Sequence, residues 1–210
     1  MTAEPPDELH GAHVPGQTPL DPSDLRGLRD RSIRTRIDLN VAEARAIAAP
    51  MVKYLAGRPS ARLAPFDAAW MRRLHAEMFA AVWTWAGALR TRDTNVGAAP
   101  HDIEPRLHDL ALDLRAWKDS GMSWLEQGAR LHHRAVLIHP FPNGNGRWSR
   151  LLANIWLRRH GQPIVKWPEQ TIGDASVIRG EYLAAIRAAD NHDLAPLVAL
   201  HARYAGRLGA

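Results

Sequence analysis

The 210-residue sequence predicts a mainly α-helical protein: a helical bundle interrupted by one short extended segment. Hydrophobic residues make up 46% of the chain and charged residues 23%, which is typical of a folded domain with a buried core. Apolar residues recur every three to four positions over most of the chain, as they do on the buried face of a helix. Only residues 86–105 break this pattern, because Gly87, Gly97, Pro100 and Pro105 favour a loop or a short β-hairpin.

Residues 1–24 predict an extended N-terminal arm, followed by a single domain over residues 25–210. The arm holds five of the 15 prolines, five of the 22 acidic residues and none of the 27 basic residues. Its low apolar content leaves little to bury in a core. No stretch of the chain approaches the ~20 apolar residues that span a bilayer, and the N-terminus lacks the pattern of a signal peptide. We therefore expect a cytoplasmic protein that does not bind a membrane.

The helices are predicted from this spacing and from their caps. Residues 38–55 are rich in alanine and leucine, and Pro50 predicts a kink there. Residues 67–85 predict the next helix, with Asp67 as its N-cap. Beyond the interruption, helical spacing resumes, and Pro196 interrupts the last helix. These later stretches are residues 102 or 103 to 117, 120–138, 146–160, 174–189 and 190–204.

Arginine dominates the basic residues, and cysteine is absent. Arginine accounts for 24 of the 27 basic side chains, and the net charge is +5. Since arginine binds phosphate bidentately, nucleotides or nucleic acid are natural partners, although codon bias could also explain this composition. The absence of cysteine excludes disulfides, thiolate metal sites and thiol nucleophiles.

The stretch HPFPNGNGRWSR, residues 139–150, allows two interpretations. Asn-Gly pairs are typical of a tight hairpin turn, but glycines before an arginine also suit a backbone cradle for an anion at the start of a helix. The flanks favour the second, because apolar residues follow helical spacing on both sides. These residues are Leu125, Ala129, His132, Val136 and His139 before the loop, and Trp148, Leu151, Leu152, Ile155 and Trp156 after it.

In a helix–loop–helix, Gly144, Asn145 and Gly146 would enter a helix whose first N–H groups have no partner within the helix. Arg147 and Arg150 lie three residues apart in its first turn, where two cations oppose the helix dipole unless an anion binds between them. The alternative is an ordinary turn, with the side chains of both arginines exposed to solvent. His139 is a candidate base beside this cradle, although a histidine next to an apolar run can also be a core residue.

This stretch resembles the signature of Fic-domain proteins, His-Pro-Phe-x-Asp/Glu-Gly-Asn-Gly-Arg-x-x-Arg, and departs from it at one specified position, Asn143. Residues 85–91, WAGALRT, are similar to the Trp-Ala-Gly-x-x-Arg-Thr that leads into the family's flap. The resemblance extends over about residues 35–205, and the chain looks most like the subgroup called mobile mystery protein B. It implies a Fic-type helical bundle with a short β-hairpin flap.

Fic proteins typically transfer AMP from ATP to a Ser, Thr or Tyr hydroxyl of a target protein. The resemblance implies that His139 is the general base and that Phe141 anchors the loop in the core. It also implies that Gly144, Asn145 and Gly146 hold the diphosphate through backbone and amide donors. Arg147 and Arg150 would neutralise the β- and γ-phosphates and stabilise the departing pyrophosphate.

The family's flap, residues 90–103 here, holds a target segment as an added β-strand, whereas without the resemblance these residues read as an ordinary loop. The resemblance implies Mg²⁺ as a cofactor beside ATP, with Asn143 in the place of the acid that binds it. An amide oxygen can coordinate Mg²⁺ but lacks negative charge, which implies weaker metal dependence, another nucleotide or an inactive enzyme. The implied target-docking residues are Arg90, Thr91, Arg92, Asp93, Thr94, Asn95, Val96 and Gly97.

Many Fic proteins carry an inhibitory Ser/Thr-x-x-x-Glu-Gly/Asn helix whose glutamate pairs with the second motif arginine, here Arg150. No Ser or Thr in this chain has Glu four residues later. We therefore expect either inhibition by a separate antitoxin-like protein, with this chain as the toxin-like half of a two-component module, or no such inhibition.

Two other functions fit parts of the sequence. A basic helical module could bind nucleic acid, but the arginines are scattered and no DNA-binding motif is present, so nucleic acid is not an expected partner. A histidine-metal phosphohydrolase could use the pairs His101-Asp102, His132-His133 and His192-Asp193, but these share no motif.

Overall fold

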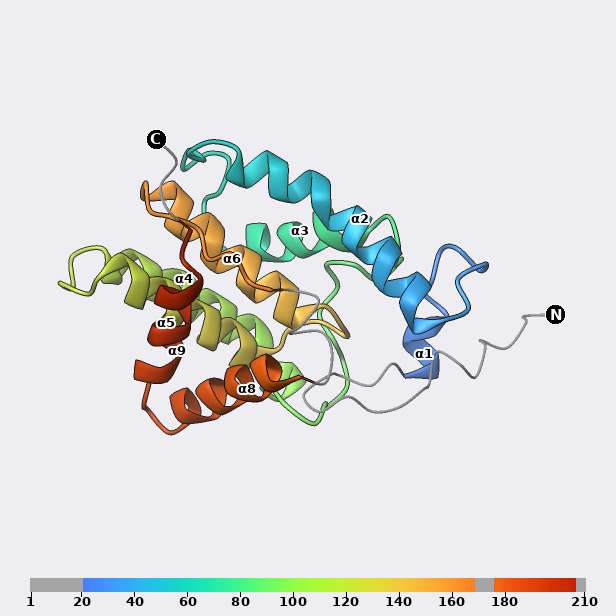
Figure 1. Ribbon diagram of the computed structural model, residues 1–210. Helices are drawn as coiled ribbons and strands as arrows, with labels where there is room; N and C mark the ends of the chain where they lie inside the picture. The colour runs from blue at the N-terminus through green and yellow to red at the C-terminus, as the bar shows by residue number, and fades with distance from the viewer. Residues whose placement is uncertain (1–20, 169–175, 207–210) are drawn as a thin grey trace.

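The computed structural model describes residues 21–168 and 176–206, and these residues are mainly helical, as predicted (Figure 1). The rest of the chain, including residues 1–20 of the predicted arm, lies outside the described residues. The helices are α1 (Pro22–Leu25), α2 (Arg36–Leu55), α3 (Ala68–Phe79), the 3₁₀ helix η2 (Pro100–Asp102), α4 (Ile103–Trp117), α5 (Trp124–Ile138), α6 (Asn145–Arg159), α8 (Val177–Asp190) and α9 (Ala195–Tyr204).

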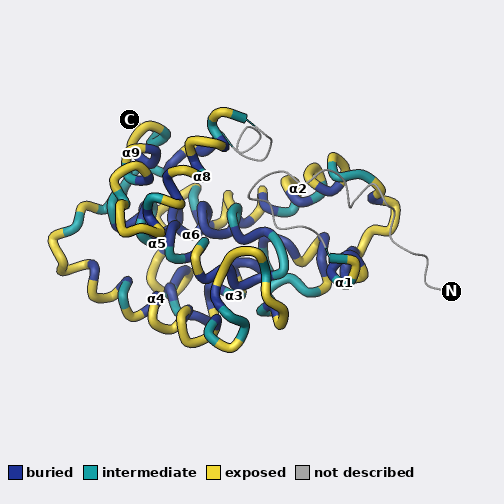
Figure 2. The backbone as a smooth tube through the Cα atoms, turned by 90° about the horizontal axis from the view of Figure 1, so that it is seen from below, coloured by how far each residue is buried: buried dark blue, intermediate teal, exposed yellow. Residues whose placement is uncertain are grey.

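Helices α5 and α6 form the centre of the molecule and pack against each other. Helices α2 and α3 pack against α6, whereas α4, α8 and α9 pack against α5 (Figure 1). Helix α6 is buried along most of its length (Figure 2), and the indoles of Trp148 and Trp156 are fully enclosed in the core. A helix at the centre of a bundle has little freedom to move, so its N-terminus is a rigid place for a site.

Local signals set most helix ends. A capping box between Thr35 and Asp38 starts α2 two residues before the predicted position. The predicted N-cap Asp67 accepts a hydrogen bond of 2.7 Å from the backbone N–H of Trp70. Helix α5 begins at Trp124 rather than residue 120, because Ser123 caps it and Gly121 adopts a left-handed φ of 75°.

The prediction that the second long helix continues to residue 85 is wrong. Helix α3 ends at Phe79, and the chain turns so that Trp83 forms an isolated antiparallel bridge with Leu28. The Trp83 indole N–H donates a hydrogen bond of 2.7 Å to the carboxylate of Glu43 on α2. Residues 80–85 therefore do not continue the helix, and they form a buried tertiary contact instead. Spacing alone could not predict this contact.

The predicted β-hairpin is also wrong: residues 86–99 contain no strand. Instead, both ends of this segment bond to the chain around the motif loop. The backbone N–H of Arg90 donates to Pro140 at 3.0 Å, and that of Ala98 donates to Ile138 at 3.2 Å. Because the carbonyls of Pro140 and Ile138 satisfy these two backbone N–H groups, they do not pair across a hairpin.

Near the C-terminus, α8 and α9 build a second, smaller core with Trp167 and Val165. Helix α9 begins at Ala195, later than predicted, with Pro196 in its first turn, where a missing N–H costs nothing. The α1 turn likewise starts within the region predicted as extended. None of the described helices is long and apolar enough to cross a membrane.

Candidate functional site

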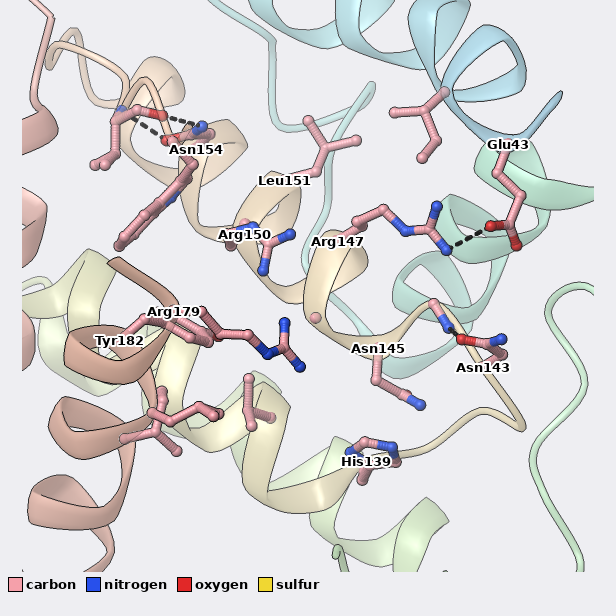
Figure 3. A pocket seen from close by; sticks show the side chains of 18 of the residues that line it. Glu43, His139, Asn143, Asn145, Arg147, Arg150, Leu151, Asn154, Arg179 and Tyr182 are labelled. Atoms are coloured by element: carbon pink, nitrogen blue, oxygen red, sulfur yellow. Dashed lines mark hydrogen bonds and ion pairs between the residues drawn. The ribbon is translucent and has the colours of Figure 1, made fainter. Parts of the chain in front are cut away.

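The motif loop, residues 139–144, joins α5 to α6 and forms one wall of a cavity of about 790 Å³ (Figure 3). The other walls come from α2, α6, the extended residues 164–167 and α8. This volume is in the range of cavities that hold a drug-sized ligand. The structure therefore gathers His139 and the predicted phosphate-binding residues around one space.

His139 ends α5 in a left-handed conformation, with φ 50° and ψ 60°. This backbone is uncommon for a residue other than glycine and concentrates at functional sites. Arg90 holds it there, because its Nε donates a 2.7 Å hydrogen bond to the His139 carbonyl. Burial first, and the Arg90 charge second, lower the pKa of the His139 ring to about 4. The imidazole is therefore neutral at pH 7, as a proton acceptor must be.

Backbone donors collect at the start of α6. Gly144 is the N-cap with φ 80°, and a Cβ there would lie 2.7 Å from the Phe79 ring. In the described part of the chain, no acceptor pairs with the N–H groups of Asn145, Gly146 and Arg147. Unpaired donors at the positive end of a 15-residue helix suit an anion such as phosphate.

Phe141 and Asn145 hold the loop from within. Phe141 is fully buried and packs edge-on against Trp148. The Asn145 side chain accepts from the Phe141 N–H at 2.9 Å and donates to the Phe141 carbonyl at 2.7 Å. Phe141 thus lies in the core, and the Asn145 side-chain amide closes the loop, which leaves the backbone N–H of Asn145 without a described acceptor.

His75 on α3 is a part of the site that the sequence analysis missed. Its ring stacks on Phe141 with centroids 3.7 Å apart. Nδ1 accepts from the Gly87 N–H at 3.0 Å, so Nε2 carries the proton and donates to the Asn143 carbonyl at 3.0 Å. Burial lowers the pKa of His75 to about 3, which keeps it neutral. A polar residue on an otherwise buried apolar face was the available signal.

Glu43 on α2 is a second missed residue. It is 2% exposed, and its Oε2 lies 2.8 Å from Nη2 of Arg147. The Arg147 guanidinium also lies 5.1 Å from the centre of the Phe79 ring. Glu43 shares the buried stripe of α2 with Leu39 and Ile47, where an acidic residue was the available signal.

Arg150 and Arg179 share the middle of the cavity. Arg150 is 6% exposed, and its guanidinium lies 5.9 Å from the centre of the Tyr182 ring. Arg179 on α8 is 7% exposed, and its guanidinium points into the same space, between Arg150 and His139 (Figure 3). Because Arg179 lies far from the motif in sequence, no local pattern pointed to it.

The residues around the loop do not fit a resident Mg²⁺ ion. Asn143 offers a neutral amide, and its Oδ1 already accepts a 2.6 Å hydrogen bond from the Gly144 N–H. The Glu43 carboxylate is engaged by Arg147 and Trp83. Over residues 21–168 and 176–206, no three His, Asp or Glu side chains gather as a metal site would need.

Of the residues predicted to dock a target, Arg90 and Arg92 make contacts within the protein, and most of the others are exposed. Arg90 is buried and points inward, where it donates to the carbonyls of His139, Arg92 and Ala98, so it supports the site rather than meeting a target. Arg92 forms ion pairs with Asp21 at 2.6 Å and Asp24 at 2.8 Å. The rest of the segment is exposed, apart from the half-buried Thr94: Thr91, Asp93, Asn95, Val96 and Gly97.

Residues 65–157 match the Fic/DOC family. The match spans less than half of the 210-residue chain. It includes the motif loop, most of α6 and His75, whereas Glu43 and Arg179 lie outside it. The mobile mystery protein B subgroup is not tested by this match and stays a prediction.

Curated relatives of the Fic/DOC domain include protein adenylyltransferases from animals. The chain is 36% identical over 123 residues to protein adenylyltransferase fic-1 of Caenorhabditis briggsae, covering 57% of this chain and 23% of the relative. It is 34% identical over 119 residues to protein adenylyltransferase Fic of Drosophila ananassae, covering 53% and 22%. The chain thus spans less than a quarter of the length of these relatives.

Solved structures show that the fold is Fic-type. A Fic-domain signaling protein from Bacteroides thetaiotaomicron is similar with a TM-score of 0.65 at 21% identity, over 78% of this chain and 68% of that one. BepC of Bartonella tribocorum, solved with bound AMPPNP, also gives a TM-score of 0.65, at 20% identity over 83% and 89%. A Fic domain from Bartonella quintana with bound ADP gives 0.63 at 21% identity, over 83% and 87%.

Proposed function

We propose that this protein is a protein adenylyltransferase that transfers AMP from ATP to a Ser, Thr or Tyr hydroxyl of a target protein. The observation that carries the proposal is a neutral His139 on the edge of a cavity that also contains the α6 N-terminus and Arg150. A base and an anion cradle on one cavity are the two parts that this reaction needs.

The relatives support the same reaction. Those from Caenorhabditis and Drosophila are named protein adenylyltransferases, and two similar Fic folds were solved with AMPPNP or ADP. Transferred to this chain, these names favour ATP as co-substrate and a protein as target.

In the proposed step, the target hydroxyl gives its proton to the His139 ring as its oxygen attacks the α-phosphorus of ATP. The new O–P bond forms as the bond to the β-phosphate oxygen breaks, and pyrophosphate leaves with that electron pair. The backbone N–H groups at the start of α6, with Arg147 and Arg150, stabilise the negative charge on the leaving group. We expect residues 93–97, which are exposed apart from the half-buried Thr94, to dock the target beside His139.

Mg²⁺ would reach this site only together with the phosphates of ATP, since motif-loop residues 139–144 include no carboxylate and Oδ1 of Asn143 is already engaged. A specific alternative follows from Asn143: a Fic protein that binds nucleotide but has altered or lost transfer activity. A separate inhibitory, antitoxin-like protein also belongs to this proposal, because no Ser or Thr in this sequence has Glu four residues later, as the family's built-in inhibitory helix requires.

The test is label transfer from ATP labelled at the α-phosphate into protein of a bacterial lysate. We expect a labelled band with the wild-type protein and none with His139→Ala. Arg115→Ala, which removes an exposed arginine from α4 outside the cavity, should label normally. No band with the wild type, in a preparation that binds ATP, would favour the binding-only alternative.

A further inference from the structure

Among the described residues that line the cavity, basic side chains outnumber acidic ones. Its described lining holds two carboxylates, and Glu43 is already paired with Arg147. A cavity with such an excess selects polyanions and raises their local concentration. The basic residues that line it are Arg36, Arg147, Arg150, Lys166, Arg179 and Arg187.

Arg179 lines the cavity, and its backbone is held at the start of α8. It is the third residue of α8, and its backbone N–H donates 3.1 Å to Oγ of the N-cap Ser176. One turn later, Tyr182 packs beside Arg150. At 7% exposure the Arg179 side chain is enclosed by the protein and lies in the wall of the cavity.

The guanidinium groups of Arg150 and Arg179 approach one space from two different helices, α6 and α8, which both pack against α5 (Figure 3). Two arginines on one face of one helix are neighbours simply because they lie three or four residues apart in the sequence. Two from different helices converge only because the tertiary structure brings them together. A polyphosphate chain that starts at the α6 N-terminus would extend past Arg150 toward Arg179.

Sites that bind nucleoside triphosphates commonly neutralise phosphate charge with a divalent ion held by carboxylates. Here Asn143 is neutral and its Oδ1 is engaged by the Gly144 N–H, so that device is missing from the described residues. Arginine forms bidentate hydrogen bonds with phosphate and stays charged at every physiological pH. A third arginine in the cavity supplies the charge that the metal ion would otherwise bring.

We propose that Arg179, together with Arg147 and Arg150, neutralises the phosphates of a bound nucleoside triphosphate, so that this site binds ATP without a divalent metal ion. The inference deepens the proposed function, because it assigns the ligand class and a specificity-determining residue to the same cavity. It concerns binding, and it holds or fails independently of AMP transfer.

The experiment is a titration of the purified protein with a fluorescent ATP analogue, in excess EDTA and again in Mg²⁺. We expect the wild-type Kd to agree within about threefold between the two buffers. Arg179→Ala should raise the Kd in EDTA by about 10- to 100-fold, the usual range for a lost hydrogen bond to a charged group, and Mg²⁺ should recover part of it. Fluorescent AMP should lose less affinity than ATP, because it lacks the β- and γ-phosphates.

Two variants make the result specific. Arg179→Lys keeps the positive charge but loses the planar guanidinium that binds phosphate bidentately, so its Kd should fall between those of the wild type and Arg179→Ala. It replaces Arg179→Ala in the experiment if the alanine variant does not fold. Arg115→Ala removes one exposed positive charge elsewhere and should bind as the wild type does. Wild-type binding that requires Mg²⁺, or Arg179 variants that match the wild type in EDTA, would overturn the inference. Metal-independent ATP binding without label transfer would overturn the proposed function and leave this inference standing.

Discussion

Oε2 of Glu43 lies 2.8 Å from Nη2 of Arg147, within the cavity that the motif arginines line. The Glu43 carboxylate is nearly inaccessible to solvent, and its other oxygen accepts from the Trp83 indole. The pair ties α2 to the first turn of α6 and sets the direction of the Arg147 guanidinium. A phosphate that approaches Arg147 therefore meets a cation already held in place, with part of its charge engaged.

Glu43→Ala should lower the free energy of unfolding by about 2–4 kcal/mol, because it removes a buried partner and leaves Arg147 and Trp83 without it. Urea unfolding of Glu43→Ala, Arg147→Ala and the double variant measures the coupling, which we expect at about 1–3 kcal/mol. Glu126→Ala, which breaks the exposed Glu126–Arg130 pair, should cost less than about 1 kcal/mol. Equal costs for Glu43 and Glu126 would contradict a structural role for the Glu43 contact.

Gly97→Ala should disturb the approach of the flap to His139. Gly97 has φ 111°, and a Cβ there would lie 2.5 Å from Cβ of His139. Gly121→Ala is the matched control, since Gly121 has φ 75° but open space around it. We expect Gly97→Ala to melt at a lower temperature than Gly121→Ala and to slow label transfer at least tenfold, while ATP affinity stays within about threefold. Equal melting temperatures would show that the close approach is unimportant.

The pH profile of AMP transfer should lack the inflection of an ordinary histidine. The pKa of His139 lies at about 4, below the usual 6.5, so the base stays neutral and competent as the pH falls from 8 to 5. We therefore expect kcat/KM to show no loss near pH 6.5 from this group. An inflection near pH 6.5 that persists when each of the other histidines is replaced would show that the surroundings of His139 do not keep it neutral.

The protein should lose stability in mild acid. Burial lowers the pKa of His75 and His201 to about 3, and it also lowers the pKa of His132 well below 6.5. Between pH 6.5 and 4 the unfolded chain binds these protons and the folded chain does not, so the free energy of unfolding falls by up to about 1.4 kcal/mol per pH unit for each group. Urea unfolding at pH 8, 6.5 and 5 measures the slope, which His201→Gln should reduce. Constant stability from pH 8 to 5 would contradict neutral buried histidines.

Much of this protein could be predicted because its signals are local. The caps Asp67 and Ser123 and the 3.6-residue spacing lie within one or two helical turns, where hydrogen bonds and burial act between near neighbours. The motif is local in the same way: His139, the glycines and Arg147 are placed by one loop and the helix after it. Sequence alone therefore determined a mainly helical fold and the position of the candidate base and phosphate cradle.

Only the tertiary structure decided what faces the motif. Spacing shows that Glu43 and His75 lie on buried faces, but it does not show that one meets Arg147 and the other Phe141. It also predicted a hairpin where the backbone of Arg90 bonds to the motif loop instead. These partners are separated by 49 to 104 residues, as in the Arg90–His139 and Glu43–Arg147 contacts, and Arg179 comes from a helix outside the Fic/DOC match. Contacts at such separations depend on how whole helices pack, and no short stretch of sequence records that choice.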